Sequence, residues 1–316
     1  MKTMIKNLIL DTDLGSDVDD VGAVALANIF HNHHLINLLC ITHTTSDKYG
    51  PLIVEAINNY YNNSNLEVGV YNGPLFKDEL IKNSYNEPTV NAFYHKHNSK
   101  EEMVDSIKLL RQKIANNKDI TLVFIGQLVN LYYLMTSNGD EFSSLSGLEL
   151  INQNVKEIYI MGGSFPEITD IESDLINGEY NLLTALKEST YCLNNLKVKT
   201  TMIDYTLGKD INVGAKLVNK YHDNNIVSYA YQRYIYKNQD CSRSSWDLIA
   251  IYRACIEDDL FNEVGPGNID IDEKGITKFQ LSKKGNFYIL KANKSFKEIE
   301  DKIEGWLLEE KEDEWR

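Results

Sequence analysis

Cysteine is scarce in this sequence, and it is scattered. There are four cysteines among 316 residues, and no two of them form a C-x-x-C pair. This spacing excludes a disulfide framework and a zinc knuckle, because both need cysteines paired at characteristic intervals. We therefore expect reduced thiols, as is typical of cytosolic proteins.

Long apolar runs are absent as well. A membrane-spanning helix needs about 20 consecutive apolar residues, and no stretch of the sequence approaches that length. Near the N-terminus, only Leu8, Ile9 and Leu10 are consecutive before Asp11. That run is too short for the apolar core of a signal peptide. We expect no membrane partner and a cytoplasmic location.

Positive charge is in deficit. The sequence has 32 Lys and Arg against 46 Asp and Glu, which gives a formal net charge of −14. A field of this sign repels phosphate backbones and anionic headgroups, so a broad nucleic-acid or membrane surface is excluded. A small neutral or cationic ligand, or a bound metal cation, is compatible with it.

Linkers and repeats are also missing. Only five prolines are present, and no proline-, glycine- or serine-rich stretch divides the chain. Hydrophobic residues make up 43% of the sequence, which is enough for one large core. We expect a single domain over residues 1–316.

What the sequence does contain is an alternation of short apolar runs and longer helical patterns. The apolar runs are continuous, which is typical of parallel strands covered on both faces. The pattern predicts an α/β fold, an open and mostly parallel sheet with helices on both faces. Residues 76–100 are polar, and we interpret them as a long loop or lid. The predicted strands are residues 8–10, 35–41, 120–125 and 157–161, and the predicted helices are residues 21–27 and 52–61.

Five aspartates fall between residues 11 and 20, where the first predicted strand meets the first predicted helix. Carboxylates packed this closely raise one another's pKa unless a positive charge is near, and Ca²⁺ or Mg²⁺ takes oxygen ligands of this kind. Ligands of an open parallel sheet bind at the carboxyl ends of its strands. We expect Asp13 and Asp20 to bind a metal cation, and we expect Asp17 to cap the helix.

A second interpretation of this segment is a phosphatase of the haloacid dehalogenase type, whose first strand ends in D-x-D-x-T/V. Asp11 would be the nucleophile and Asp13 the acid. Gly15 stands where that motif has Thr or Val, which makes phosphoryl transfer the weaker hypothesis. It predicts Mg²⁺-dependent release of phosphate.

The same segment resembles the N-terminal signature of the nucleoside hydrolase (inosine–uridine-preferring) family, in a version with two extra residues before the final Asp-Asp. Later segments resemble further landmarks of that family in the same order, so the resemblance covers essentially the whole chain. They are residues 121–130 (T-L-V-x-x-G-x-L-T-N), residues 160–166 (M-G-G), residues 178–181 (E-x-N) and residues 245–250 (H/W-D-x-x-A).

The resemblance implies hydrolysis of the N-glycosidic bond of ribonucleosides, with a bound Ca²⁺ and a nucleoside as the small-molecule substrate. It makes Asp13 the general base and a metal ligand. The remaining metal ligands would be Asp20, Asp247 and the main-chain carbonyl of Ile125. Asp19 would hold the ribose hydroxyls, with Glu179 and Asn181 at the 5′-hydroxyl and the ring edge. It also implies a homo-oligomer, a homodimer or homotetramer.

The sequence departs from the family at the leaving-group side. Trp246 stands where many members have His, and it either stacks on the base or fills the core. Asp47 is the nearest counterpart of an Asn that the family offers to the ribose. Tyr229 and Arg233 share one face of a predicted helix and are candidate base contacts. These departures keep open a third hypothesis, a calcium-dependent nucleoside-binding protein without turnover.

Overall fold

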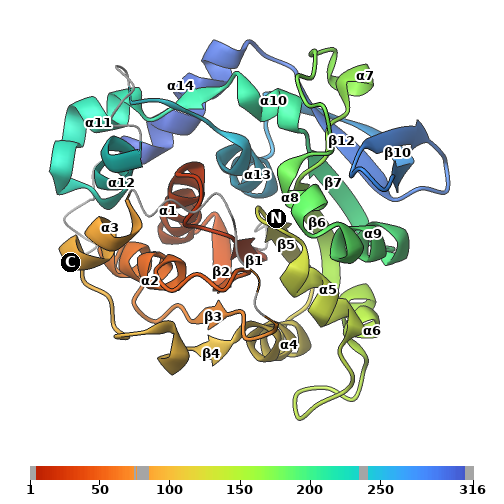
Figure 1. Ribbon diagram of the computed structural model, residues 1–316, viewed down its shortest axis with the longest axis horizontal. Helices are drawn as coiled ribbons and strands as arrows, with labels where there is room; N and C mark the ends of the chain where they lie inside the picture. Colours follow the sequence, from red (N-terminus) through yellow and green to blue (C-terminus); the bar gives the residue numbers. More distant parts are fainter. Residues whose placement is uncertain (1–4, 75, 77–84, 235–240, 310–316) are drawn as a thin grey trace.

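The computed structural model describes residues 5–74, 76, 85–234 and 241–309. Its main feature is a ten-stranded sheet of order β11-β10-β12-β7-β6-β5-β1-β2-β3-β4, with a separate β8–β9 ribbon (Figure 1). The strands are β1 Lys6–Thr12, β2 Ile36–His43, β3 Val68–Val70, β4 Val104–Asp105, β5 Ile120–Phe124, β6 Val155–Met161, β7 Lys199–Ile203, β8 Asn212–Val213, β9 Arg243–Ser244, β10 Phe261–Ile271, β11 Thr277–Leu281 and β12 Phe287–Ala292.

From β12 to β4 every neighbouring pair in the sheet is parallel. Only β10 runs antiparallel, to β11 on one side and to β12 on the other. The predicted mostly parallel sheet is therefore confirmed. The four predicted strands coincide with β1, β2, β5 and β6.

Helices cover both faces of the sheet, as predicted, and the apolar side chains of β1 show why. Leu8 and Leu10 belong to one buried cluster with α1, α2, α12, α13 and α14, whereas Ile9 belongs to the other with α4, α5, α6 and α9. The helices are α1 Asp19–Asn32, α2 Gly50–Tyr60, α3 Asn86–Ala92, α4 Ser106–Asn116, α5 Val129–Thr136, α6 Gly147–Asn154, α7 Pro166–Thr169, α8 Tyr180–Thr184, α9 Leu186–Asn195, α10 Tyr205–Lys209, α11 Ala215–Tyr221, α12 Ile226–Tyr234, α13 Trp246–Cys255 and α14 Phe296–Leu307, with 3₁₀ turns η1 Lys100–Glu102 and η2 His222–Asn224.

The loop expected over residues 76–100 is wrong in part, because α3 lies within it. Thr89 and Val90 of α3 are buried, so tertiary packing orders a segment whose polar composition predicts a loop. Residues 77–84 of the same expectation lie outside the described residues.

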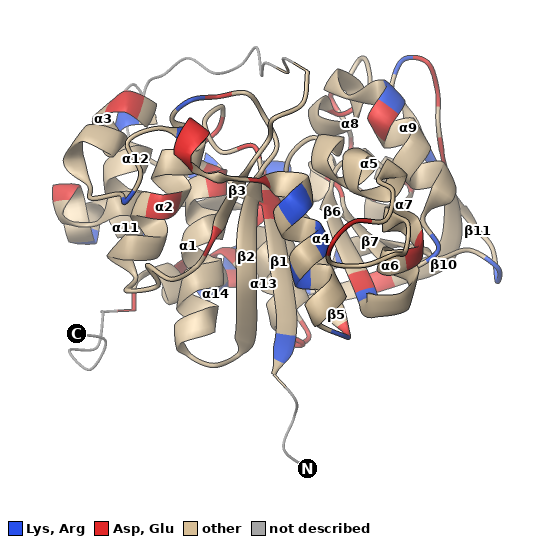
Figure 2. Ribbon diagram, turned by 90° about the horizontal axis from the view of Figure 1, so that it is seen from below, with Lys and Arg blue, Asp and Glu red and all other residues tan. Residues whose placement is uncertain are grey.

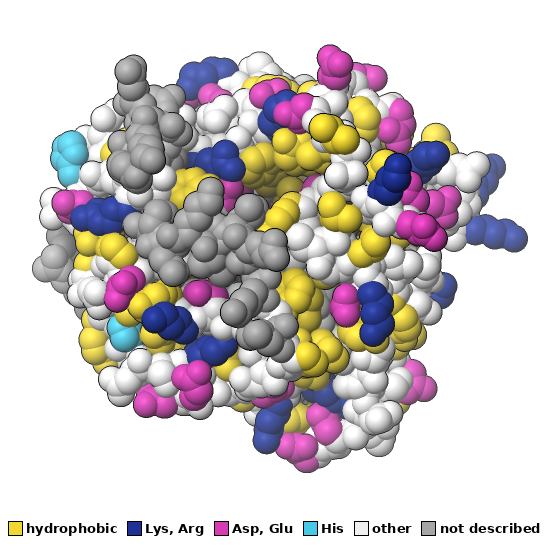
Figure 3. Space-filling model, viewed as in Figure 1, with side chains coloured by type: hydrophobic (Ala, Val, Ile, Leu, Met, Phe, Trp, Pro, Cys, Tyr) yellow, Lys and Arg dark blue, Asp and Glu magenta, His cyan; other side chains and the backbone are white. Residues whose placement is uncertain are grey.

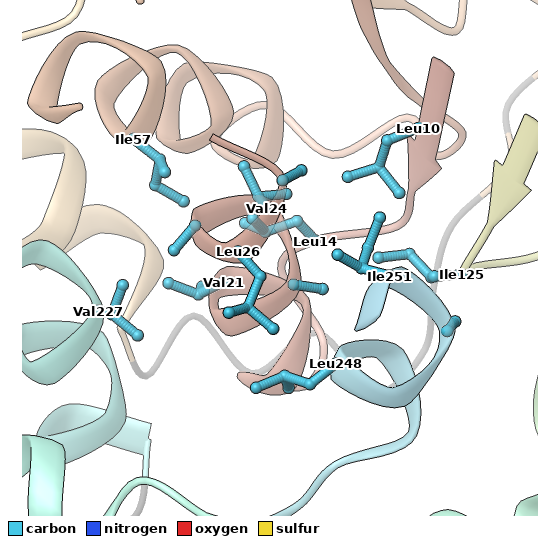
Figure 4. Close-up of a cluster of buried hydrophobic side chains, with 14 of the residues drawn as sticks. Leu10, Leu14, Val21, Val24, Leu26, Ile57, Ile125, Val227, Leu248 and Ile251 are labelled. Carbon is cyan, nitrogen blue, oxygen red and sulfur yellow. The ribbon is translucent and has the colours of Figure 1, made fainter. Parts of the chain in front are cut away.

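The packing of α1 on α13 positions the functional residues. Leu248 and Ile251 of α13 lie in one buried cluster with Val21 and Val24 of α1 (Figure 4). A Cβ built on Gly22 would lie 3.1 Å from the Leu248 side chain, so the glycine allows the two helices to approach closely. The first turns of α1 and α13 are thereby held side by side.

None of the helices in the described ranges combines the length and the apolar character that crossing a bilayer requires.

Candidate active site

A cavity of about 510 Å³ opens at the carboxyl ends of the parallel strands. In Figure 2 β1 begins at its lower end, so the carboxyl ends of the parallel strands lie at the top, among acidic segments of the ribbon. The face drawn in Figure 3 is hollowed near α13 and α8. The cavity is lined by Asp13, Ser16, Asp17, Asp19, Asp20, Ile125, Met161, Glu179, Tyr180, Asn181, Tyr205, Lys209, Asp210, Arg243, Ser244, Trp246 and Asp247.

Three buried carboxylates at the inner wall form an acidic trio, Asp19, Asp20 and Asp247. Each offers an oxygen within 4.8 Å of the others. Asp19 and Asp20 begin α1, and Asp247 is the second residue of α13. Burial, together with the neighbouring carboxylates, raises the pKa of Asp20 and of Asp247 well above the ordinary value, and burial raises that of Asp19 to about 8. Such a cluster holds its negative charge only when a cation offsets the repulsion.

Asp13 follows β1 and lies beside the acidic trio, since its charge also raises the pKa of Asp20 and of Asp247. The end of β5 approaches it closely, because a Cβ on Gly126 would lie 2.7 Å from the Asp13 Cβ. The side-chain amide of Gln127 donates to Asp13 Oδ2 at 2.7 Å. Glycine at position 126 therefore lets the backbone after β5 fold against Asp13.

A hydroxyl group and a main-chain carbonyl group also lie at the inner wall of the cavity, beside the carboxylates. The hydroxyl of Thr12 donates to Asp20 Oδ1. The main-chain carbonyl of Ile125 accepts a hydrogen bond of 3.1 Å from Asn181 Nδ2. Carboxylates, a backbone carbonyl and water are the donor set that Ca²⁺ prefers. The residues present therefore fit a hard divalent cation.

Glu179 is the N-cap of α8 and is buried at the cavity wall. Its Oε1 accepts from the backbone N–H of Asn181 at 2.8 Å, and its Oε2 accepts from the backbone N–H of Gly163 at 3.1 Å. Burial raises the pKa of Glu179 to about 7, against the opposing effect of these bonds. Glu179 and Asn181 thus come to the same cavity as the acidic trio.

Trp246, the first residue of α13, lines the cavity and is half-buried. Its ring stacks on Tyr205, with centroids 5.7 Å apart and planes 16° apart, and its Nε1 donates to the Tyr205 carbonyl at 2.7 Å. A Cβ on Gly208 would lie 2.2 Å from Trp246 Cδ1. The indole is therefore held between α10 and the cavity.

Asp17 does not cap α1 as predicted, because the N-cap residue is Val18, whose side chain makes no capping hydrogen bond. Instead the Asp17 carboxylate pairs with Arg243, whose Nε donates to Oδ1 at 2.9 Å. The Arg243 guanidinium also lies 5.1 Å from the Trp246 ring centroid. Its charge partly offsets the repulsion on Asp19.

Three predicted substrate contacts do not line this cavity. Asp47 accepts from the backbone N–H groups of Tyr49, at 2.9 Å, and Gly50, at 2.6 Å, at the start of α2. Arg233 packs its guanidinium 3.1 Å from the Tyr229 ring centroid and pairs with Asp223. These side chains are therefore engaged by local packing, and their contact with a substrate stays a prediction.

Asp11, the nucleophile of the phosphatase hypothesis, is a residue of β1 and does not line the cavity. It is buried, and its Oδ2 accepts bonds of 2.6 Å from Thr42 Oγ1 and from Asn130 Nδ2. Burial raises its pKa to about 7. A nucleophile must reach its substrate, so this placement counts against phosphoryl transfer.

Three further residues of this region, Tyr205, Arg243 and Gln127, are not predicted from the sequence. Tyr205 comes two residues after the end of β7, so inspection of every strand end would have found it. Gln127 directly follows Gly126 within residues 121–130, the segment that resembles a family landmark. Arg243 has no signal of this kind, because the β8–β9 ribbon that carries it is not visible in the pattern.

Comparison with known proteins identifies the family of this chain. The family model for the inosine-uridine preferring nucleoside hydrolase matches residues 8–293. No curated protein sequence matches the chain significantly.

Solved structures share the fold at low sequence identity. A plant nucleoside hydrolase, the PpNRh1 enzyme, has a TM-score of 0.70 at 13% identity, over 96% of this chain and 98% of that chain. The inosine-uridine preferring nucleoside hydrolase from Bacillus anthracis has a TM-score of 0.66 at 13% identity, over 96% of this chain and 98% of that chain. The purine-preferring ribonucleoside hydrolase from Gardnerella vaginalis has a TM-score of 0.63 at 15% identity, over 96% of this chain and 99% of that chain. Since the family model spans most of the chain, the protein belongs to the inosine-uridine preferring nucleoside hydrolase family and is a hydrolase acting on nucleosides.

Proposed function

We propose that the protein hydrolyses the N-glycosidic bond of ribonucleosides to ribose and free base in a calcium-dependent reaction, with water activated by Asp13. The observation that carries this proposal is the meeting of Asp13 with the acidic trio at one cavity. These carboxylates come from two distant parts of the sequence. Their burial without a cation is costly, which favours a bound metal.

The cation would be held by Asp13, Asp20, Asp247 and the main-chain carbonyl of Ile125. Asp19 lies within the same group of oxygens, and it is available to the ribose hydroxyls on the cavity side. A bound divalent cation supplies Lewis-acid chemistry at water and at hydroxyl oxygens. The oxygen-only donor set favours Ca²⁺ or Mg²⁺ over softer metals.

Asp13 would take the proton from the attacking water. Cleavage of a ribosyl bond passes through an oxocarbenium-like cation, and a carboxylate can serve as the general base in such a reaction. Asp13 lines the cavity and is held by Gln127. The general base, Asp13, is therefore fixed in position before substrate enters, which lowers the entropic cost of the reaction.

The ribose would be held by Asp19 at its 2′- and 3′-hydroxyls and by Glu179 and Asn181 at its 5′-hydroxyl and ring edge. Asn181 Nδ2 donates to the Ile125 carbonyl. This hydrogen bond connects a residue proposed to hold the ribose with a residue proposed to hold the metal. Carboxylates that accept hydroxyl bonds also stabilise positive charge developing on the sugar.

The leaving base would stack on Trp246. Its indole cannot donate a proton with a useful pKa, but its face is backed by Tyr205. Stacking on a supported aromatic ring positions a planar base.

We also propose that the protein is a single domain over residues 1–316 and that it forms a homodimer or homotetramer.

The test is reducing-sugar release from inosine, adenosine, guanosine, uridine and cytidine, with Ca²⁺ and with chelator, for the wild type and Asp13→Ala. We expect ribose only with metal, and none from the variant. Release that survives chelation or the substitution would contradict the proposed chemistry. Saturable binding without release would support the binding-protein hypothesis.

A further inference from the structure

Gln127 lies in the segment after β5 and contacts Asp13, the residue proposed as the general base. Its side chain is fully buried and does not line the cavity. Its Nε2 donates to Asp13 Oδ2 at 2.7 Å. Facing a carboxylate, only the NH₂ end of the amide can make this bond. Gln127 thus reaches Asp13 from the protein interior, behind the cavity wall.

The backbone of Gln127 is anchored on both sides. Its carbonyl accepts from Thr44 Oγ1 at 3.2 Å and from the backbone N–H of Val129 at 2.8 Å. The preceding Gly126 packs directly on Asp13. A side chain carried on so fixed a backbone delivers its donor in one direction, so Asp13 has little freedom to rotate away.

The other end of the Gln127 amide adds a second argument. Its Oε1 is buried and has no hydrogen-bond partner among the described residues. A buried unsatisfied acceptor destabilises a fold, whereas an apolar side chain of the same size would not. Packing alone therefore does not account for an amide here, and its bond to Asp13 does.

We propose that Gln127 is a positioning residue of the reaction, which holds one oxygen of Asp13 so that the rest of the carboxylate meets the water in a fixed orientation. This inference rests on the proposed function, in which Asp13 is the base. Gln127 touches neither the substrate nor the reacting atoms. It acts through Asp13 alone.

The test compares Gln127→Met, which keeps the length and removes the donor, with the wild type at saturating Ca²⁺. We expect kcat to fall by roughly 10- to 100-fold, because small misplacement of a catalytic group costs that much. KM should stay within about 2-fold, since the residue does not line the cavity. Calorimetric titration of Ca²⁺ alone into the metal-free variant should still show binding.

Two further variants keep the inference falsifiable. Gln127→Asn retains a buried amide on an arm too short to reach Asp13, and it should lose kcat in the same way if Gln127→Met does not fold. Gln232→Met is the matched control. It removes a glutamine whose Nε2 donates to the Ser228 carbonyl at 3.3 Å, away from the cavity, and should leave kcat unchanged.

Comparison of Gln127→Met with Asp13→Ala separates the two proposals. If Asp13→Ala is inactive but Gln127→Met keeps the wild-type kcat, the positioning role is overturned and the proposed function stands. If Asp13→Ala keeps activity, the proposed function itself fails. A rise in KM that matches the loss of activity would also overturn the positioning role.

Discussion

The backbone N–H of Asp247 donates to Asp19 Oδ2 at 3.2 Å, joining the first turn of α13 to the first turn of α1. Residues that are 228 positions apart in the sequence are thereby held in one acidic trio. The bond satisfies one of the free N–H groups at the start of α13. The close packing of α1 on α13 therefore serves the site directly.

Metal binding should stabilise the fold measurably, because it offsets the repulsion within the acidic trio. At a Ca²⁺ concentration about 100 times Kd, the melting temperature should rise by roughly 4 °C over that in chelator. Differential scanning calorimetry with NaCl at matched ionic strength is the control. An equal rise with NaCl would show charge screening rather than a site.

Asp20→Asn should act in opposite directions with and without metal. Burial and its neighbours raise the pKa of Asp20, so a neutral amide should raise the melting temperature in chelator. Because a ligand is lost, Ca²⁺ affinity should fall at least about 10-fold. Calorimetry of the exposed-site variant Asp270→Asn should show neither change. A variant that binds Ca²⁺ as tightly as the wild type would remove Asp20 from the ligands.

Glu179 should make stability depend on pH. Its pKa is about 7 in the folded protein against an ordinary value of 4.5, so the folded state binds the proton more tightly. The free energy of unfolding therefore falls as pH rises from about 4.5 through about 7, by at most about 3 kcal/mol from this group. Urea unfolding of wild type and Glu179→Gln at pH 5 and pH 8 checks this. Parallel pH profiles for the two proteins would contradict it.

Gly208→Ala should disturb the leaving-group side without touching a reacting group. Its Cβ would lie 2.2 Å from Trp246 Cδ1, so the indole must move from its stack on Tyr205. We expect kcat/KM for the best nucleoside to fall by about 10-fold, as when a base loses its stacking partner.

Gly305→Ala is the matched control for this helix glycine. A Cβ at Gly305, within α14, meets nothing within 4 Å, so this variant should keep its activity and gain up to about 1 kcal/mol of stability. Steady-state kinetics of both variants is the measurement. Wild-type kinetics for Gly208→Ala would mean that the position of Trp246 does not matter to the reaction.

The sequence predicts the carboxylates of the inner wall better than it predicts the outer residues of the site, which we call its rim. Asp13 and Asp20 are within reach of local pattern, because one follows a buried strand and the other opens the next helix, and parallel strands bring such positions to one edge. The roles of Ile125, Asp247, Glu179 and Asn181 follow only from the resemblance of whole segments to a family.

The rim depends on long-range packing that no local pattern carries. Tyr229 and Arg233 share a helix face, as predicted, but the packing of Arg233 on the Tyr229 ring and its pairing with Asp223 occupy them. Arg243 reaches the site only because a short ribbon places it beside Asp17. Helical periodicity shows which residues share a face, and the tertiary contacts decide what that face meets.

The most direct measurement follows ribose and free base together by chromatography, with inosine and then uridine, in Ca²⁺ and in chelator. The account predicts equal amounts of the two products in Ca²⁺ for at least one of the nucleosides, and none in chelator. Free base without ribose, equal turnover in chelator, or no turnover of either nucleoside by Ca²⁺-loaded protein would contradict calcium-dependent N-ribohydrolysis.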